Sequence, residues 1–130
     1  MTALLDTSIL IRHLTGDPPE LAARATTYLA TTKKLILEDL ILAEVVYVLE
    51  SFYKVPRNQT AELARSISTF RNIQTADLTL LMRAVEIYEI HRIDFSDAYI
   101  AAVAETTGVR NIASFDRSID RIPTISRIEP

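Results

Sequence analysis

Hydrophobic residues follow two patterns that alternate along the chain. Short continuous apolar runs predict buried strands, and longer stretches with apolar residues three or four positions apart predict helices. The predicted strands are 3–5, 34–37, 72–75, 109–115 and 124–128. The predicted helices are 7–14, one that begins at Pro19, 39–53, 60–70, 78–89 and 94–107. Strands without polar alternation that are separated by helices are typical of a parallel sheet covered on both faces.

The predicted fold is therefore a small α/β sandwich, and 130 residues suit one ordinary domain spanning 1–130. In such sheets, functional groups gather beyond the carboxyl ends of the strands. The helix at 94–107 has the clearest end signals. We expect Asp94 as its N-cap, Asp97 stands at its third position, and Gly108 follows its last turn.

Composition narrows the chemistry that this chain can perform. The 48 % hydrophobic and 24 % charged residues are typical of a folded domain. The absence of cysteine excludes thiolate chemistry and Cys-based metal sites, and it fits a reducing cytoplasm. Two glycines are too few for a Rossmann or P-loop phosphate loop. No apolar run approaches the ~18 residues of a membrane span, and no signal peptide is recognisable.

The net charge of −3 does not attract nucleic acid over the whole surface. Any role with nucleic acid must therefore depend on local basic patches or on bound cations. Lys and Arg together number 14, and most of them are Arg, which binds phosphate better in a bidentate way.

Glu44 is the one ionisable residue within the apolar run "LILAEVVYVL". Burial of a carboxylate there would be costly unless a cation or hydrogen-bond donors met it. The alternative is that Glu44 lies on the surface of a two-sided helix.

Three aspartates stand where a strand ends or a helix begins: Asp6, Asp97 and Asp116. Each also has a purely structural interpretation. Asp6 and Asp116 could be N-caps, and Asp97 could form a capping box with Asp94.

Taken together, the four carboxylates predict a metal site. Asp6 and Asp116 would share one rim of a parallel sheet, and the start of a helix carrying Asp97 can point at the same rim. Carboxylates gathered there repel one another unless a cation neutralises them or some are protonated. A site of oxygen ligands alone favours Mg²⁺ or Mn²⁺. Metal-assisted hydrolysis of phosphodiesters is the chemistry that such a site suits.

Four motifs, "LLDTSIL", "LAEVVYVLE", "DFSDAYIAA" and "ASFDRSID", in this order, resemble the PIN-domain ribonucleases, and most closely the VapC-type toxins. The resemblance runs over essentially the whole chain. It implies a PIN-like three-layer α/β/α sandwich with a short, mainly parallel central sheet. It also implies cleavage of RNA with Mg²⁺ or Mn²⁺, leaving a 5′-phosphate and a 3′-hydroxyl.

The resemblance also implies roles for individual residues. Asp6, Asp97 and Asp116 would hold one or two metal ions, and Glu44 would hold a metal or orient the attacking water. The supporting residues that the resemblance suggests are Thr7, Ser8, Asp94, Ser114, Arg117 and Asp120. Arg117 could bind a phosphate, although it could also be a solvated arginine on a turn.

Partners follow from the same resemblance. VapC-type proteins typically form homodimers and are inhibited by a protein antitoxin, so we expect both here, with RNA as the substrate. We expect no direct sequence-specific DNA binding by this chain, since it shows no DNA-reading motif. The alternative function is a non-cleaving PIN-like module that binds RNA or protein.

Two other phosphate-handling folds fail on their motifs. A two-component receiver domain needs a second acid beside the first aspartate, but Leu5 precedes Asp6. A haloacid-dehalogenase-like phosphatase needs an aspartate two positions after the first, but that position is Ser8.

Overall fold

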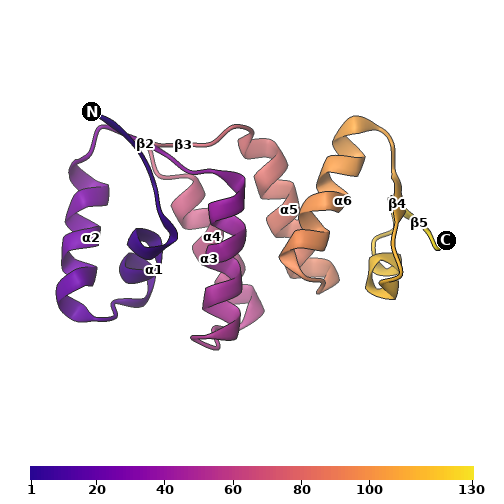
Figure 1. The fold of residues 1–130 in the computed structure, drawn as a ribbon, viewed down its shortest axis with the longest axis horizontal. Helices are drawn as coiled ribbons and strands as arrows, with labels where there is room; N and C mark the ends of the chain where they lie inside the picture. Colours follow the sequence, from indigo (N-terminus) through magenta and orange to yellow (C-terminus); the bar gives the residue numbers. More distant parts are fainter. The chain divides into compact units, whose positions relative to one another are not determined.

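Strands and helices alternate along the chain in the order that the hydrophobic pattern predicts. A computed structural model describes residues 1–130, which fall into two compact units, Met1–Ala76 and Asp77–Pro130 (Figure 1). The first unit holds β1 (Thr2–Leu4), α1 (Thr7–Thr15), α2 (Pro19–Thr31), β2 (Lys34–Ile36), α3 (Asp39–Ser51), α4 (Arg57–Ser68) and β3 (Ile73–Gln74). The second holds α5 (Leu78–His91), α6 (Phe95–Thr107), β4 (Asn111–Ala113), the 3₁₀ helix η1 (Arg117–Arg121) and β5 (Ser126–Ile128).

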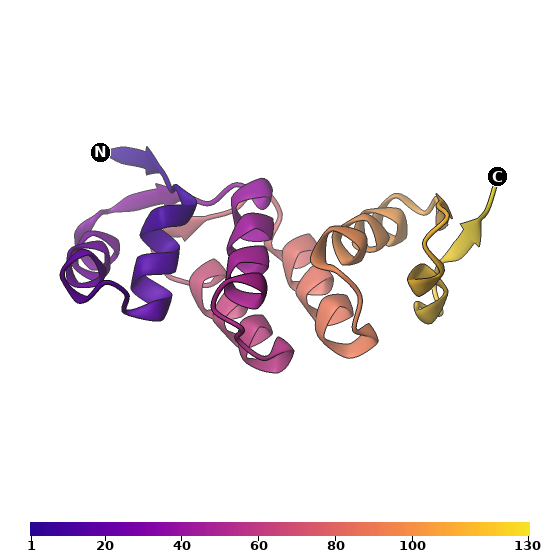
Figure 2. The same cartoon turned by 60° about the horizontal axis from the view of Figure 1, so that its bottom comes forward.

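The first unit is built on a parallel sheet of three strands in the order β1-β2-β3 (Figure 2). Ala3 pairs with Leu35, and Leu35 pairs with Ile73. Because the strands are parallel, their carboxyl ends lie at one edge, and α1 begins at that edge immediately after β1. Asp6 lies between β1 and α1, so it stands at the sheet edge where the sequence predicted it.

Burial in the first unit follows the apolar faces of the four helices. The side chains of Leu10, Leu42, Leu49 and Ile67 are fully buried, as is Leu35 of the central strand. Each of these residues contributes about 1.5–3 kcal/mol of hydrophobic stabilisation relative to an exposed side chain. This core fixes α1, which Asp6 precedes, and α3, which carries Glu44 in its second turn.

The second unit is a pair of helices joined to a small parallel sheet of β4 and β5. Helices α5 and α6 pack along each other in both views (Figures 1 and 2). The ring of Tyr88 packs edge-to-face against Phe95, with centroids 6.0 Å apart. Arg83 of α5 donates two hydrogen bonds to the carboxylate of Glu105 on α6, at 2.7 and 2.8 Å.

The α/β class and the parallel strand pairs are confirmed, but the prediction that every strand is buried on both faces is wrong. Strands β1, β4 and β5 each expose their first and last residues, and Leu4 is 67 % exposed. Of the apolar run 3–5, only Leu5 is buried, and it directly follows β1.

Element boundaries also differ from the prediction in places. Helix α3 ends at Ser51 and not at 53, and α4 begins at Arg57, directly after Pro56, and not at 60. Pro fixes its own φ and suits the position before a helix, which moves that start toward the amino terminus. The 3₁₀ helix η1 was not predicted, because a single short turn has no hydrophobic period. No helix is long and apolar enough to cross a membrane.

Candidate active site

Asp6 stands between β1 and α1 as the N-cap of the helix. Its Oδ2 accepts hydrogen bonds from the Ser8 hydroxyl at 2.7 Å and from the Ser8 backbone N–H at 3.1 Å. Donors to the charged form favour it, so the Ser8 hydroxyl and N–H hold the pKa of Asp6 below its usual value. Both bonds use Oδ2, which leaves Oδ1 available to a ligand. The capping interpretation of Asp6 is therefore confirmed, and it does not exclude metal binding.

Thr7 follows Asp6 and is 7 % exposed. Its Oγ1 has no hydrogen-bond partner in the protein. Buried hydroxyls are normally satisfied, so an orphaned one beside a groove indicates a missing partner such as water or a ligand. Thr7 lines a groove of about 370 Å³ together with Asp6, Ser8 and Glu44.

Glu44 lies on α3 and contributes to the same groove as Asp6. The expectation that apolar neighbours bury it is wrong, because Glu44 is exposed. Its neighbours on that helix face are exposed as well, with Leu40 at 78 % and Tyr47 at 68 %. The run "LILAEVVYVL" is apolar on both sides of the helix, and only one side enters the core. The exposed alternative for Glu44 is the one that the structure adopts.

Asp97 and Asp116 are neighbouring carboxylates in the second unit, and each shifts the pKa of the other. Asp97 is half-buried in the first turn of α6, and Asp116 follows β4. Burial raises the pKa of Asp97, and the charges of Asp116 and Asp94 raise it further. Two neighbouring carboxylates cannot both ionise without cost, so Asp116 ionises at lower pH than Asp97.

Asp116 is positioned by two serines. Its backbone N–H donates to the Ser114 hydroxyl at 2.9 Å, and its Oδ1 accepts from the Ser118 N–H at 2.9 Å. The bonds from Ser118 lower the pKa of Asp116. The capping interpretation of Asp116 is confirmed, with the 3₁₀ helix η1 as the element that it caps.

Asp94 occupies the N-cap position of α6, but its side chain makes no capping hydrogen bond. The prediction that Asp97 and Asp94 form a capping box is therefore wrong, because the capping hydrogen bond to Asp94 is absent. Asp94 acts on Asp97 through its charge, which raises the pKa of that carboxyl. Because Asp94 lies close to this pair and does not cap the helix, its carboxylate is available to a ligand.

The two remaining candidates have different surroundings. Asp120 forms an ion pair with Arg127, with Nε to Oδ1 at 3.0 Å, and Arg127 also bonds the Ser114 carbonyl oxygen. Asp120 thus supports the strand end that carries Ser114 and has its charge already matched. Arg117 is exposed and makes no ion pair, so it is accessible to a phosphate.

The structure therefore brings the predicted acids together as two pairs, one in each unit: Asp6 with Glu44, and Asp97 with Asp116. Within neither unit do three carboxylates or histidines gather as a metal cluster. Each pair offers oxygen atoms alone. Carboxylate oxygens, together with the orphaned Thr7 hydroxyl in the first unit, are the kind of group that suits a hard divalent cation.

Arg12 is a groove residue that was not predicted. It lies one turn after Ser8 on α1, and both line the groove that contains Asp6. The sequence contained one signal for Arg12. It stands four residues after Ser8 in a predicted helix, so the two side chains lie on the same face. An arginine beside two carboxylates can neutralise an anionic ligand that approaches them.

The chain matches one family of known proteins. The family model for the PIN domain matches residues 3–125, which spans both units. The chain belongs to the PIN-domain family. This confirms the resemblance that was predicted from the four motifs. Nucleases of this family are metal-dependent in general, and the candidate acids offer the oxygen atoms that a hard cation prefers.

Two relatives illustrate the likeness of this PIN domain. It is 23 % identical to a VapC ribonuclease from Aquifex aeolicus (strain VF5), over 92 % of this chain and 90 % of the relative. Among solved structures it is similar to Mycobacterium tuberculosis VapC20, which is described as a sarcin–ricin loop cleaving toxin. That similarity has a TM-score of 0.45 and 20 % identity, over 92 % of this chain and 93 % of the other.

Proposed function

We propose that this PIN domain is a metal-dependent endoribonuclease that hydrolyses RNA phosphodiester bonds, and that it is the toxin of a toxin–antitoxin pair. The observation that carries the proposal is the Asp97–Asp116 pair, two neighbouring carboxylates at the end of a parallel strand. Its family and its VapC-type relative support the same activity.

In this proposal residues 1–130 act as one PIN domain, and Asp6, Glu44, Asp97 and Asp116 act together as ligands of Mg²⁺ or Mn²⁺. The family match across both units supports one domain. The ion supplies charge neutralisation at a phosphate and lowers the pKa of a water that it binds.

The other residues prepare the site for an anionic substrate. A divalent cation bound by Asp97 and Asp116 would offset the burial and the repulsion between neighbouring carboxylates that raise the pKa of Asp97. Ser8 and Ser114 fix Asp6 and Asp116 through the hydrogen bonds described above. The orphaned hydroxyl of Thr7 donates to an oxygen of water or substrate in the groove. Arg117 has no competing carboxylate and binds a phosphate.

A homodimer and a protein antitoxin belong to the proposal. Exposed apolar side chains on one face of α3 and at its end support contact with a partner, since Leu40, Tyr47 and Phe52 are 68–78 % exposed. Light scattering of the purified protein measures the oligomeric state directly. A small antitoxin encoded beside this gene would inhibit the activity.

Metal binding is tested by thermal unfolding with Mn²⁺. At 100 times its Kd, Mn²⁺ should stabilise the parent by about 2.7 kcal/mol, because it binds the folded state alone. Asp97→Asn, which keeps the shape and removes a ligand charge, should show a smaller shift. Equal shifts in both proteins would place the ion elsewhere and remove the proposed site.

RNA cleavage is tested with the same two proteins and Mn²⁺. Hydrolysis by the parent and not by Asp97→Asn supports the enzyme. If both proteins degrade RNA equally, the activity is contamination. Metal binding without any hydrolysis would favour the alternative, a non-cleaving PIN-like module that binds RNA or protein.

A further inference from the structure

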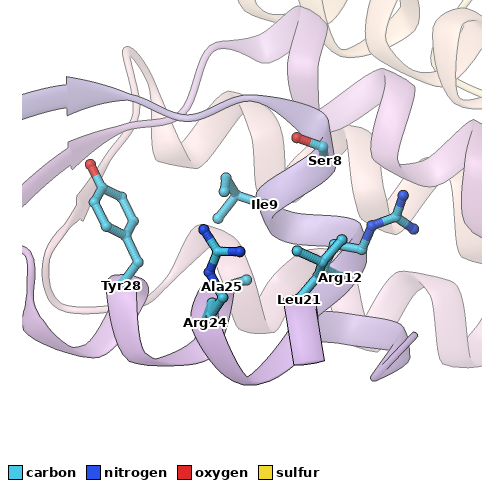
Figure 3. A pocket seen from close by; sticks show the side chains of 7 residues that line it. All are labelled: Ser8, Ile9, Arg12, Leu21, Arg24, Ala25 and Tyr28. Carbon is cyan, nitrogen blue, oxygen red and sulfur yellow. The ribbon is translucent and has the colours of Figure 1, made fainter. Parts of the chain in front are cut away.

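A second groove adjoins the one that contains Asp6 and Glu44. It has a volume of about 420 Å³, lies between α1 and α2, and shares Ser8 and Arg12 with the acidic groove. Figure 3 shows Tyr28 at one end of it, Arg12 at the other and Arg24 between them. Any chain-like ligand that occupies this groove would thus reach the acidic groove by passing Arg12.

The surface continues in the other direction along α2. Arg24 and Tyr28 also line a third hollow, which reaches Thr31. Thr31 in turn lines a fourth, together with Lys33 and Arg71. We name the residues Arg12, Arg24, Tyr28, Lys33 and Arg71 the basic track.

Beyond Arg12, which also lines the groove of Asp6 and Glu44, the charge of the basic track is not compensated. None of its three hollows is lined by Asp or Glu. Arg24, Lys33 and Arg71 are exposed and form no ion pair. Arg12 donates one hydrogen bond, to the carbonyl oxygen of Asp17 at 3.2 Å. In a protein of net charge −3, three unpaired cations that lead to Arg12 form a local anion-binding surface.

The basic track also contains an exposed aromatic ring, that of Tyr28. Tyr28 is 39 % exposed between the basic side chains, and no hydrogen bond occupies its hydroxyl. Cations that follow a phosphate backbone, combined with an aromatic face on which a base stacks, are characteristic of surfaces that bind single-stranded nucleic acid. An acidic protein segment would use the cations but not the ring.

We propose that the basic track binds single-stranded RNA and leads it past Arg12 to the acidic groove. The proposal rests on the ribonuclease function above, since it assigns the path by which the substrate of that site arrives. Phosphates would contact the four cations, and one base would stack on Tyr28. The track lies within the first unit and needs no residue of the second.

Binding is measured without divalent metal, so that it does not depend on catalysis. The probe is a fluorescein-labelled single-stranded RNA of about 12 nucleotides, with anisotropy read in a chelator at several salt concentrations. The double variant Arg24→Gln/Arg71→Gln should bind about 10-fold or more weakly, and its log K against log salt slope should fall by about 1.4. Tyr28→Ala should bind at least about 5-fold more weakly with the slope unchanged, and Tyr28→Phe should bind like the parent.

The matched control is Arg92→Gln, an exposed arginine of the second unit that lines none of these hollows. It removes one positive charge, as each track substitution does, and should bind within about 2-fold of the parent. If the double variant binds RNA as tightly as the control does, the proposed RNA-binding role of the basic track is wrong. Competition by poly-L-glutamate as effective as by unlabelled RNA would also overturn it, since the surface would then dock an acidic protein segment.

Cleavage with Mn²⁺ separates this proposal from the one it rests on. If the parent cleaves RNA and the double variant binds and cleaves like it, the track fails while the ribonuclease function stands. If the double variant loses binding and no protein cleaves RNA, the path for RNA stands and the hydrolytic function fails.

Discussion

The two units hold their acidic residues in different ways. In the first, Asp6 and Glu44 are exposed, and the pKa of Asp6 lies below its usual value because Ser8 donates to it. In the second, Asp97 is half-buried beside another carboxylate, and its pKa is raised. The charged form of this side chain is thus favoured at Asp6 and disfavoured at Asp97. The difference arises from donors and burial and not from the residue type.

The largest effect that we expect is on RNA cleavage. Asp97→Asn and Asp6→Asn should each lower the rate at least about 100-fold, since each removes a proposed ligand charge. Glu44→Gln should cost less if Glu44 orients water. Initial rates at saturating Mn²⁺ measure this. Equal small effects of all three would contradict a shared site.

The next effect is on stability and concerns the ion pair that joins α5 to α6. Arg83 and a hydrogen bond from Thr124 lower the pKa of Glu105 to about 2. Because its folded pKa is depressed, the charge of Glu105 stabilises the protein above pH ~4.5, and this stability is lost as the pH falls toward 2. Glu105→Gln should therefore cost about 2–3 kcal/mol at pH 7, measured by chemical denaturation.

The matched control for that variant is Glu62→Gln in the first unit. Glu62 pairs with Arg65 at 2.6 Å, but its side chain is 71 % exposed. Exposed pairs contribute about 0.2–1 kcal/mol, so this variant should be close to the parent. A loss as large as that of Glu105→Gln would show that burial does not distinguish the two pairs.

The smallest effect separates the two aspartates directly, in the absence of metal. Asp6→Asn should lose about 0.5 kcal/mol, because Asn caps nearly as well but lacks the charge that the helix dipole favours. Asp97→Asn should be slightly more stable at pH 7, by less than about 1 kcal/mol, since it removes like-charge repulsion.

The pH dependence of stability tests the prediction that Asp97→Asn is more stable than the parent at pH 7. The folded pKa of Asp97 is raised, so protonated Asp97 stabilises the fold at low pH, and this is lost as pH rises through the raised pKa. The advantage of Asn at position 97 should therefore disappear on acidification. Thermal midpoints between pH 4 and 8 would show it, and a pH-independent difference would contradict the raised pKa of Asp97.

Much of the fold could be predicted from the sequence. Helix starts at Thr7, Pro19, Asp39 and Leu78 match the expectation, since periodicity and capping residues act locally. Gly108 ends α6 in the left-handed conformation, as the pattern indicated. The order of elements and the four motifs were enough to identify the PIN family.

Only the tertiary structure decided which apolar faces are covered. A run such as "LILAEVVYVL" is equally apolar on both sides, so the sequence cannot say which side Glu44 shares with solvent. Nor could it distinguish Asp94, which makes no capping bond, from Asp6, which does, because both precede helices. The basic track depends on residues from α1, α2 and the turn before β3 that come together by packing alone. Local rules set the elements, while burial, pKa and surface charge depend on neighbours that are distant in the chain.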